Sequence, residues 1–430
     1  MTDFSSISLF PATPQQVTES RKRTSVQWAK GLTLEQYLER DRVMDNYEHA
    51  ADGKLITWVL APRSDPMTLD FMCACETFRR TGVIVRPAAD GSVQVEEVPC
   101  YGIASVFTPA SKRGKGYAGQ MMRLLHWILA PTSSFATDFP GEWGSPPVAR
   151  LQDARFSILY SDVGSEFYHN SGPTPNKGHG WVATGMENTS WNVDNIQSQG
   201  RSEERCRWLR QEDAVRVWEQ DAELLKQDAR SYADKTHTIV FSLLPNQSVG
   251  VFTIQRLMTF TSDLVPTLPS DIWGVQLLDN CEQQESLAFA TWTLESGNPK
   301  IMVLTRLRTT RSSFTVLLKK LMERAKDTGI ETIECWNLPE QLRDMAMELG
   351  GRTFLRDDHL SSVKWYGPET EDTVRWLFNE KCERHIGQTI GRNVSDLDYI
   401  KLCIRTQRLK DPHMPVLLRS SSISDVLQSL

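Results

Sequence analysis

The chain lacks the sequence features of several common protein classes. Its 430 residues contain no apolar run long enough to cross a bilayer, and residues 1–16 lack the basic start and apolar core of a signal peptide. The eight cysteines form no C-x-x-C pair and no zinc-ligand spacing with histidine. We therefore expect an intracellular, cytoplasmic protein with reduced thiols, no bound metal and no membrane association.

An excess of positive charge is also missing. The 48 lysines and arginines are outnumbered by 54 aspartates and glutamates, which gives a formal net charge of −6. Binding to nucleic acid without regard to sequence requires a basic surface, so we do not expect a nucleic-acid partner. The chain is long enough to form two domains or more.

Two common nucleotide-binding patterns are absent from the one glycine-rich basic turn, at residues 112–118 (KRGKGYA). A Walker A loop requires Gly-x-x-x-x-Gly-Lys-Ser/Thr, and the turn does not have this spacing. A dinucleotide fold requires Gly-x-Gly-x-x-Gly, for which only two glycines are suitably placed before Gly119.

A strand, this turn and a helix follow one another, and together they predict an anion site. Residues 103–107 are largely apolar and predict a strand that ends before Pro109, and residues 116–129 predict a helix with an apolar stripe. The first amides of a helix have no internal partners and favour negative charge. Gly114 and Gly116 allow the backbone to approach a phosphate closely.

The turn matches a further pattern, Arg-x-x-Gly-x-Gly/Ala, at Arg113, Gly116 and Ala118. After a strand, this pattern resembles the acetyl-CoA pyrophosphate loop of the GNAT superfamily of N-acetyltransferases. A second motif of that superfamily, Phe/Leu-Tyr-x-x-x-Gly after the next strand, is matched by Phe167, Tyr168 and Gly172. Two motifs in this order are more specific than either motif alone.

A narrower resemblance rests on residues 58–60 (WVL), 75–78 (CETF), 106–118 and 159–162 (LYSD). Together these segments are similar to the fungal free-lysine N6-acetyltransferase family. The resemblance implies transfer of an acetyl group from acetyl-CoA directly to the ε-amine of free L-lysine in a ternary complex, as a step of lysine degradation. Alternative acceptors are a protein or histone lysine or a polyamine, and a further alternative is a non-catalytic acyl-CoA-binding protein.

The resemblance also assigns residues to the co-substrate. The backbone of residues 105–107 would pair with the pantetheine arm, and residues 113–118 would hold the pyrophosphate. Ser161 stands where an asparagine is common in the superfamily. The implied acetyl-CoA ligands are Ser105, Val106, Phe107, Arg113, Gly114, Lys115, Gly116, Tyr117, Ala118 and Ser161.

Acid and base candidates follow from the chemistry of acetyl transfer. Tyr168 lies where the superfamily's general acid usually lies, and a phenol suits a thiolate leaving group. An ε-ammonium must lose a proton before it attacks, which calls for a carboxylate. The candidates are Glu97, which strand alternation places on the same face as Ser105, and Glu76 on the neighbouring strand. The carboxylate of Leu430 is a more distant alternative.

The order of elements predicts a mixed α/β (α+β) protein with two related domains. Residues 1–195 would form a GNAT acetyltransferase domain with a mixed central sheet flanked by helices, with its closing strands at residues 180–193. Residues 196–236 would form a helical connection. Residues 237–430 would form a degenerate GNAT-like domain with a helical tail, because residues 306–311 (RLRTTR) contain no glycine to wrap a pyrophosphate.

Overall fold

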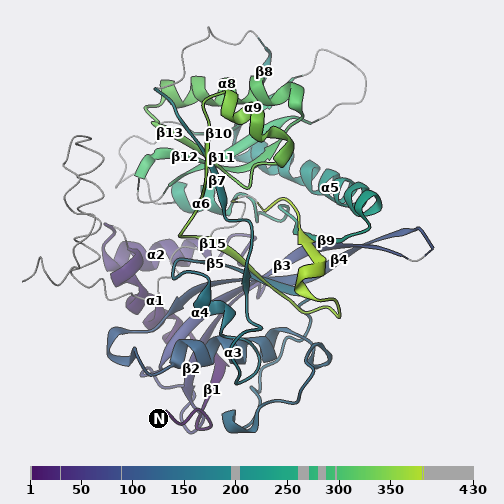
Figure 1. Cartoon of the computed structure of the whole chain (residues 1–430). Coiled ribbons are helices and arrows are strands. Elements are labelled where there is room, and N and C mark those ends of the chain that lie inside the picture. The colour runs from purple at the N-terminus through teal and green to yellow at the C-terminus, as the bar shows by residue number, and fades with distance from the viewer. Residues whose placement is uncertain are drawn as a thin grey trace, which may run out of the picture. The chain divides into compact units, whose positions relative to one another are not determined.

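The computed structural model describes residues 2–29, 31–88, 90–194, 204–259, 271–278, 287–295, 298–379 and 381. The chain divides into two compact units, Met1–Ile390 and Gly391–Leu430, and every described residue belongs to the first. Leu430 therefore lies outside the described residues. Within the first unit the strands form two sheets (Figure 1).

The first sheet contains nine described strands in the order β1-β2-β3-β4-β5-β15-β6, with β9 beside β3 and β16 beside β9. The pairs β4–β5 and β9–β16 are parallel, and the other pairs are antiparallel. The strands are β1 (Ile7–Pro11), β2 (Leu55–Pro62), β3 (Cys73–Pro87), β4 (Val93–Phe107), β5 (Phe156–Ser161), β6 (Val182–Ala183), β9 (Ile239–Leu243), β15 (Leu360–Trp365) and β16 (Val374–Trp376).

Helices cover both faces of this sheet. Helices α3 (Tyr117–Leu129) and α4 (Glu166–His169) pack with the side chains of Ile103 and Val106 on one face. On the other face, α1 (Pro14–Trp28) and α2 (Leu34–Met44) pack against Phe107. Both of these helices begin with a capping box that the sequence supplies, Thr13 with Gln16 and Thr33 with Gln36.

The second sheet repeats the arrangement, with the order β14-β7-β13-β12-β11-β10-β8. Its β12 and β13 are parallel and are joined through helix α8, just as β4 and β5 are joined through α3. The strands are β7 (Glu187–Asn192), β8 (Cys206–Arg210), β10 (Ile272–Leu277), β11 (Phe289–Glu295), β12 (Asn298–Arg308), β13 (Thr332–Trp336) and β14 (Arg352–Leu355). The accompanying helices are α5 (Gln211–Thr236), α6 (Phe252–Met258), α8 (Arg311–Asp327) and α9 (Arg343–Glu348).

The two halves exchange strands. β7 comes before residue 195 but pairs with β13 and β14 in the second sheet, while β15 returns from the second half to pair with β5 and β6 in the first. The prediction that residues 180–193 close the first sheet is therefore wrong for β7. Sequence pattern indicates that a strand exists, but its partner is chosen by the packing of the whole molecule. The domain boundaries at 195 and 236 stay a proposal.

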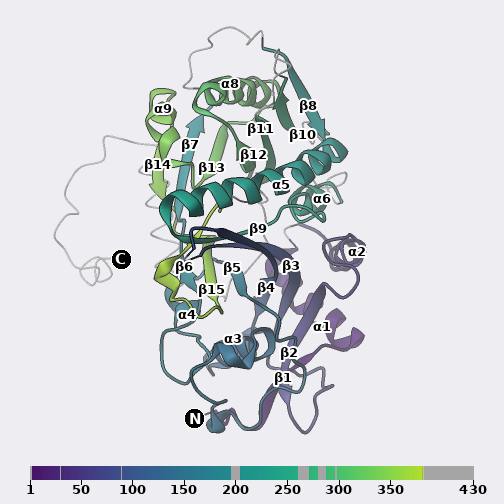
Figure 2. The same ribbon diagram turned by 90° about the vertical axis from the view of Figure 1, so that its right-hand side faces the viewer.

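Helix α5 contacts strands of both sheets, namely β3, β4 and β9 of the first and β8 and β10 of the second (Figure 2). The expected helical connection at 196–236 is thus a strand, β8, followed by α5 in its described part. The sequence also predicts a helix at residues 372–385, as the start of the helical tail, and this prediction is wrong where those residues are described. Val374–Trp376 form β16, in which Val374 and Trp376 alternate with exposed Arg375.

Candidate active site

The parallel strands β4 and β5 separate from each other, as the resemblance implies. They pair only at Tyr101 with Ser157 and Gly102 with Ile158. Beyond these pairs, no described strand pairs with residues 104–107 of β4 on the β5 side. The backbone groups of this free edge can accept an extended ligand in the manner of an added strand.

A β-bulge in β4 lies next to this free edge. The pairing with β3 shifts between Glu76–Ala104 and Ala74–Phe107, and Ser105 adopts a positive φ of 54°. The extra residue reverses the alternation of side chains, so Val106 faces α3 together with Ile103 while Ser105 faces the α1–α2 side. The regular alternation by which the sequence places Ser105 on the same face as Glu97 is therefore broken at Ser105. The Ser105 hydroxyl donates to Glu76 Oε2 at 2.6 Å.

The glycine-rich turn has the backbone conformation that an anion loop requires. Gly114 and Gly116 have φ of 75° and 80°, and Gly116 is the N-cap of α3 with no side chain to cover the first amides. Arg113 Nε donates to the carbonyl of Thr108 at 3.0 Å, which ties the turn to the end of β4. Residues 114–116 are exposed, so the first amides of α3 open towards solvent.

The corresponding helix start in the second half is closed. Thr310 caps α8, because its hydroxyl accepts the Ser313 amide at 3.2 Å while its own amide donates to the Ser313 hydroxyl at 2.9 Å. The preceding Arg306 and Arg308 both form ion pairs with buried Asp221. Since capping occupies the amides that an anion would use, the first half is the better place for a phosphate.

The remaining turn and strand candidates occupy structural positions around this loop. Val106 and Ala118 are buried, and Phe107 packs edge-on against Trp28 with ring centroids 5.8 Å apart. Tyr117 opens α3 and packs partly buried against the core, whereas Lys115 is exposed.

Tyr168 lies on the single turn of α4 and is fully buried. Its hydroxyl has no hydrogen-bond partner among the residues that the structure describes. Burial raises the pKa of this phenol well above its ordinary value, and the negative charge of Asp162 adds to the shift. The hydroxyl therefore stays protonated at neutral pH and has a hydrogen bond to offer to a ligand.

The Ser161 side chain is engaged within the chain. Its hydroxyl donates to the carbonyl of Gly164 at 2.6 Å and accepts the amide of Val163 at 3.2 Å. These bonds hold the turn between β5 and α4, which carries Tyr168. Ser161 thus shapes the approach to the site, and a direct contact of Ser161 with the co-substrate stays a prediction.

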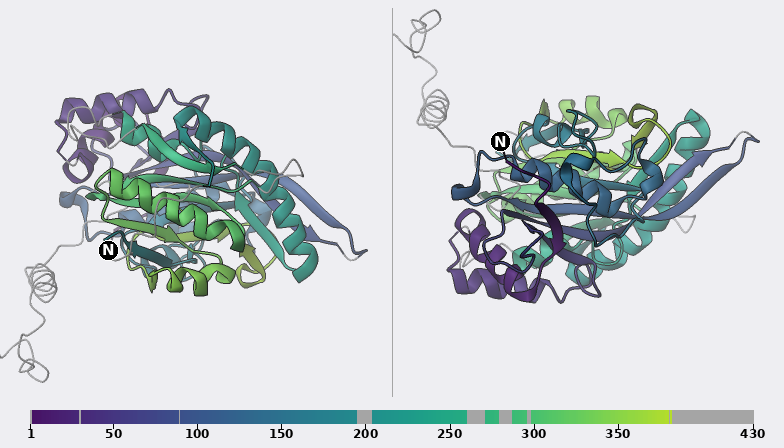
Figure 3. Two further views of the ribbon diagram at one scale, coloured as in Figure 1. Left: turned by 90° about the horizontal axis from the view of Figure 1, so that it is seen from above. Right: turned by 90° about the horizontal axis from the view of Figure 1, so that it is seen from below.

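Glu97 lies far from the bulge. Eight residues separate it from Ser105 along β4, which corresponds to roughly 26 Å of strand. It pairs with Val83, which in turn pairs with Ser242 of β9, in the half of the β3–β4 hairpin that leads to the extended tip seen in Figure 3. Its carboxylate forms an ion pair with Lys226 of α5 at 2.6 Å. This placement argues against Glu97 as the base, because alternation in the sequence cannot show how far apart two residues on one face lie.

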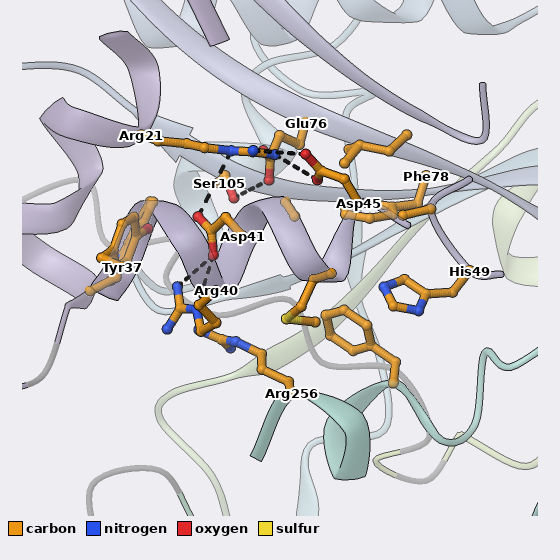
Figure 4. Close-up of a pocket in the computed structure, with 16 residues that line it drawn as sticks. Arg21, Tyr37, Arg40, Asp41, Asp45, His49, Glu76, Phe78, Ser105 and Arg256 are labelled. Carbon is orange, nitrogen blue, oxygen red and sulfur yellow. Dashed lines mark hydrogen bonds and ion pairs between the residues drawn. The ribbon is translucent and has the colours of Figure 1, made fainter. Parts of the chain in front are cut away.

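Glu76 instead lines a pocket between β4, α1, α2 and α6 (Figure 4). The pocket encloses about 530 Å³, including its open mouth, and it contacts the bulge through Ala104 and Ser105. Burial raises the pKa of Glu76, while the positive charge of Arg21 and the hydrogen bond from Ser105 oppose this shift. A carboxylate with a raised pKa beside the free edge of β4 is a candidate base.

Sequence reasoning missed the other charged residues of the pocket. Arg21 forms a bidentate ion pair with Asp45, with N–O distances of 2.8 and 2.7 Å, and lies 3.8 Å from Asp41. Asp41 and Asp45, at the end of α2, are four residues apart and so lie on one face of the helix. This spacing is the one signal of the pocket that the sequence contains. Arg256 of α6 completes the lining from the second half of the chain.

Parts of the chain are similar to known proteins. Residues 190–384 match the family described as "LYC1 GNAT-like C-terminal domain". Over 188 residues the chain is 27% identical to a lysine acetyltransferase from Yarrowia lipolytica, an alignment that covers 43% of each chain. The chain is thus similar to a GNAT-like domain over residues 190–384 and to a lysine acetyltransferase over 188 residues, and each of these two matches covers less than half of the chain.

Two further similarities bear on the fold. An uncharacterised protein from Saccharomyces cerevisiae is 30% identical over 114 residues, which cover 22% of this chain and 28% of that protein. A structure from Enterococcus faecalis, described as a probable N-acyltransferase, superimposes with a TM-score of 0.50 at 11% identity, covering 84% of this chain and 73% of the other. The chain thus spans less than half the length of the curated relatives that it matches. The predicted fold class, a GNAT fold with a second, degenerate copy, is confirmed.

Two features are absent from the described ranges. None of the helices there has the length and apolar character that a bilayer crossing requires. No group of three or more His, Cys, Asp or Glu side chains in those ranges is arranged to hold a metal ion.

Proposed function

We propose that the protein is an acetyl-CoA-dependent N-acetyltransferase that acetylates the ε-amine of free L-lysine. The observation that carries this proposal is the bulge in β4. It brings Glu76, through Ser105, to the point where the edge of β4 becomes free. A candidate base thus lies beside a strand edge that is suited to a pantetheine arm, and this arrangement supports the proposal.

The residues present suit acetyl-CoA. The turn at residues 113–118 has the two left-handed glycines and the open helix start that a diphosphate needs. Residues 105–107 offer free backbone groups at the β4 edge, although the positive φ at Ser105 restricts which of them face the same way. When bound, acetyl-CoA supplies an acetyl group activated as a thioester.

Glu76 would prepare the amine. An ε-ammonium has a pKa of about 10.4, so roughly three pH units separate it from its reactive form at neutral pH. The Glu76 carboxylate, directly or through a water molecule, would accept this proton, and the neutral nitrogen would then form a bond to the acetyl carbon. Because the pKa of Glu76 is raised, it lies closer to neutral pH, where a general base exchanges protons most efficiently.

Tyr168 would complete the transfer. As the carbon–sulfur bond breaks, the electron pair leaves on sulfur, and the Tyr168 hydroxyl would donate its proton to the thiolate. The buried hydroxyl without a partner supports this role, since a ligand would satisfy its hydrogen bond. Burial raises the pKa of Cys73 and Cys75, so neither thiol is a ready nucleophile, which favours direct transfer in a ternary complex.

The identity of the acceptor, free L-lysine, is the more specific part of the proposal. It is supported by the similarity to the lysine acetyltransferase of Yarrowia lipolytica and by a pocket bounded by two helices and a residue of the second half. A protein lysine or a polyamine stays the alternative acceptor, and a non-catalytic acyl-CoA-binding protein is the alternative outside enzymes. A cytoplasmic location and a role in lysine degradation are part of the same proposal.

One substrate panel separates these functions. The full chain is incubated with acetyl-CoA and either L-lysine, a histone-tail peptide or spermidine, and free CoA is measured together with the acetylated product by mass spectrometry. We expect turnover with L-lysine and acetylation at the ε-nitrogen. Turnover with the histone-tail peptide or with spermidine, and not with L-lysine, would show that the acceptor is a protein lysine or a polyamine. Binding of acetyl-CoA without turnover of any amine would support the non-catalytic alternative.

A further inference from the structure

The charged side chains of the pocket are balanced and divided between two ends. Three carboxylates and three guanidinium groups line it. These residues are Asp41, Asp45, Glu76, Arg21, Arg40 and Arg256. A pocket with equal numbers of both signs suits a ligand that also carries both signs, provided that the charges are arranged in the matching order.

The end next to the bulge is suited to an amine. Glu76 is bonded to Ser105 there, and the charged groups that act most strongly on Glu76 include Arg21, Asp41 and Asp45. Arg21 is already held by both oxygens of Asp45. The acceptor oxygens of Glu76 are therefore the natural partner for the nitrogen that attacks.

The other end contains Arg40 and Arg256, together with the Asp41 carboxylate that pairs with Arg40 at 2.8 Å. Arg40 lies over the ring of Tyr37, with its guanidinium carbon 4.4 Å from the ring centroid. Burial and the negative charge of Asp41 raise the pKa of the Tyr37 hydroxyl, and the positive charges of Arg40 and Arg256 oppose this shift, so both arginines lie near that hydroxyl. Figure 4 shows Arg40 and Arg256 directed towards the same region, on the side of the pocket away from Glu76.

Arg256 lies at this end because it belongs to helix α6, which packs against the first half of the chain. The Tyr47 and Thr259 hydroxyls are 3.2 Å apart, and the Ser248 hydroxyl donates to Glu48 at 2.6 Å. The rings of His49 and Phe252 meet edge to face at 4.6 Å. These contacts anchor α6 at both its ends, so the position of Arg256 is fixed by the fold.

We propose that Arg256, with Arg40 beside it, binds the α-carboxylate of a free amino acid whose side-chain amine reaches Glu76. The guanidinium fork matches a carboxylate and binds it through two hydrogen bonds. Asp41 accepts from Arg40 Nε at 2.9 Å, so it lies where the neighbouring α-ammonium would be held. The second half of the chain would thus determine substrate class, because a lysine within a protein has no free α-carboxylate. This inference rests on the proposed acetyl transfer.

The test uses the full-length protein with two probes, L-lysine and L-lysinamide, which differ in the carboxylate alone. For the unchanged protein we expect kcat/KM to be about 10- to 100-fold higher for lysine than for lysinamide, the usual effect of a charge-assisted hydrogen-bond pair. Arg256→Gln should raise KM for lysine by a similar factor, with little change in kcat, and should leave KM for lysinamide nearly unchanged. Arg256→Lys should restore part of the affinity for lysine. Arg42→Gln, at an exposed arginine of α2 outside the pocket lining, is the matched control and should change neither KM.

Several results would overturn the inference. Equal kcat/KM of the unchanged protein for the two probes would do so without any variant, which also covers the case in which Arg256→Gln fails to fold. An equal rise of both KM values in Arg256→Gln would show that Arg256 supports the shape of the pocket and does not read the carboxylate. If the unchanged protein acetylates neither probe while it binds acetyl-CoA, it is the proposed function that fails.

Discussion

At the scale of single residues, Tyr168 carries the clearest prediction. Tyr168→Phe should lower kcat by about 100- to 10,000-fold, the range for loss of a general acid. It should leave the Kd for acetyl-CoA nearly unchanged, because the ring still fills its buried site. The variant should be as stable as the parent or more stable, since it removes a buried hydroxyl that has no partner in the described part of the chain. Steady-state kinetics, calorimetric titration and urea unfolding measure these three quantities.

Tyr101 offers a matched control for this substitution. It is also a buried tyrosine, but its hydroxyl donates to Asp153 Oδ1 at 2.7 Å. Tyr101→Phe should therefore destabilise the protein by about 1 kcal/mol or more and leave kcat close to its original value. Full activity in Tyr168→Phe would show that the acid is another group.

Glu76 carries a prediction about rate and pH. Glu76→Gln should lower kcat/KM by about 100- to 10,000-fold because the amine loses its base. In the parent, kcat/KM should rise with pH as the Glu76 carboxyl group ionises, and this rise should occur above the usual carboxyl range because burial raises its pKa. Glu97→Gln is the control, since it breaks an ion pair with Lys226 on the surface and should not affect turnover. The opposite ranking of these two variants would restore Glu97 as the base.

The same raised pKa affects stability. Between the ordinary carboxyl pKa of 4.5 and the raised value, the folded state binds more protons at Glu76 than the unfolded chain does. The free energy of unfolding therefore falls as pH rises through this interval. Glu76→Gln removes this contribution, so the free energy of unfolding of the variant should fall less steeply with pH. Urea unfolding at a series of pH values, from below 4.5 to neutral, measures the difference in slope.

At the scale of elements, the turn before α3 is the most testable feature. Gly116→Val should weaken acetyl-CoA binding about tenfold or more, because a β-branched residue is strained at φ 80° and its Cβ would lie 3.1 Å from the ring of Phe4. Gly91→Val, at the turn of the β3–β4 hairpin, is the control because Gly91 has a similar φ of 81° with no neighbour within 4 Å. Both variants should lose stability, but Gly116→Val alone should change the Kd. Unchanged affinity in Gly116→Val would contradict the loop assignment.

The same elements show what the sequence could and could not predict. The strand, the turn and α3 were predicted because glycine spacing and helix periodicity are local signals. The bulge at Ser105 could not be predicted, since serine carries no signal for a left-handed φ in a strand. The pocket could not be predicted either, because Arg21, Glu76 and Arg256 meet through packing between segments that are far apart in the chain.

At the scale of the whole molecule, the strand exchange makes the two halves depend on each other. β5 pairs with β15 over six residues, from Phe156 with Trp365 to Ser161 with Leu360. A chain that ends at residue 195 lacks β15 and also β9, the neighbour of β3. Its β5, whose six residues are all buried in the whole chain, would keep only its two pairs with β4 and would expose its other edge, which is an aggregation hazard. The same cut leaves β7 without β13 and β14.

We therefore expect fragment 1–195 to be insoluble or unfolded when it is produced alone, although it contains every residue assigned here to acetyl-CoA. Co-expression with fragment 196–430 should recover a complex that binds acetyl-CoA, because each fragment supplies strands that the other needs. The chain Met1–Ile390, which keeps the whole first unit, is the control and should fold and bind. Gel filtration measures the oligomeric state, circular dichroism the folding, and calorimetric titration the binding of acetyl-CoA. A folded, monomeric fragment 1–195 that binds acetyl-CoA would mean that the exchanged strands contribute little, and that the second half acts on the site through α6 and Arg256 alone.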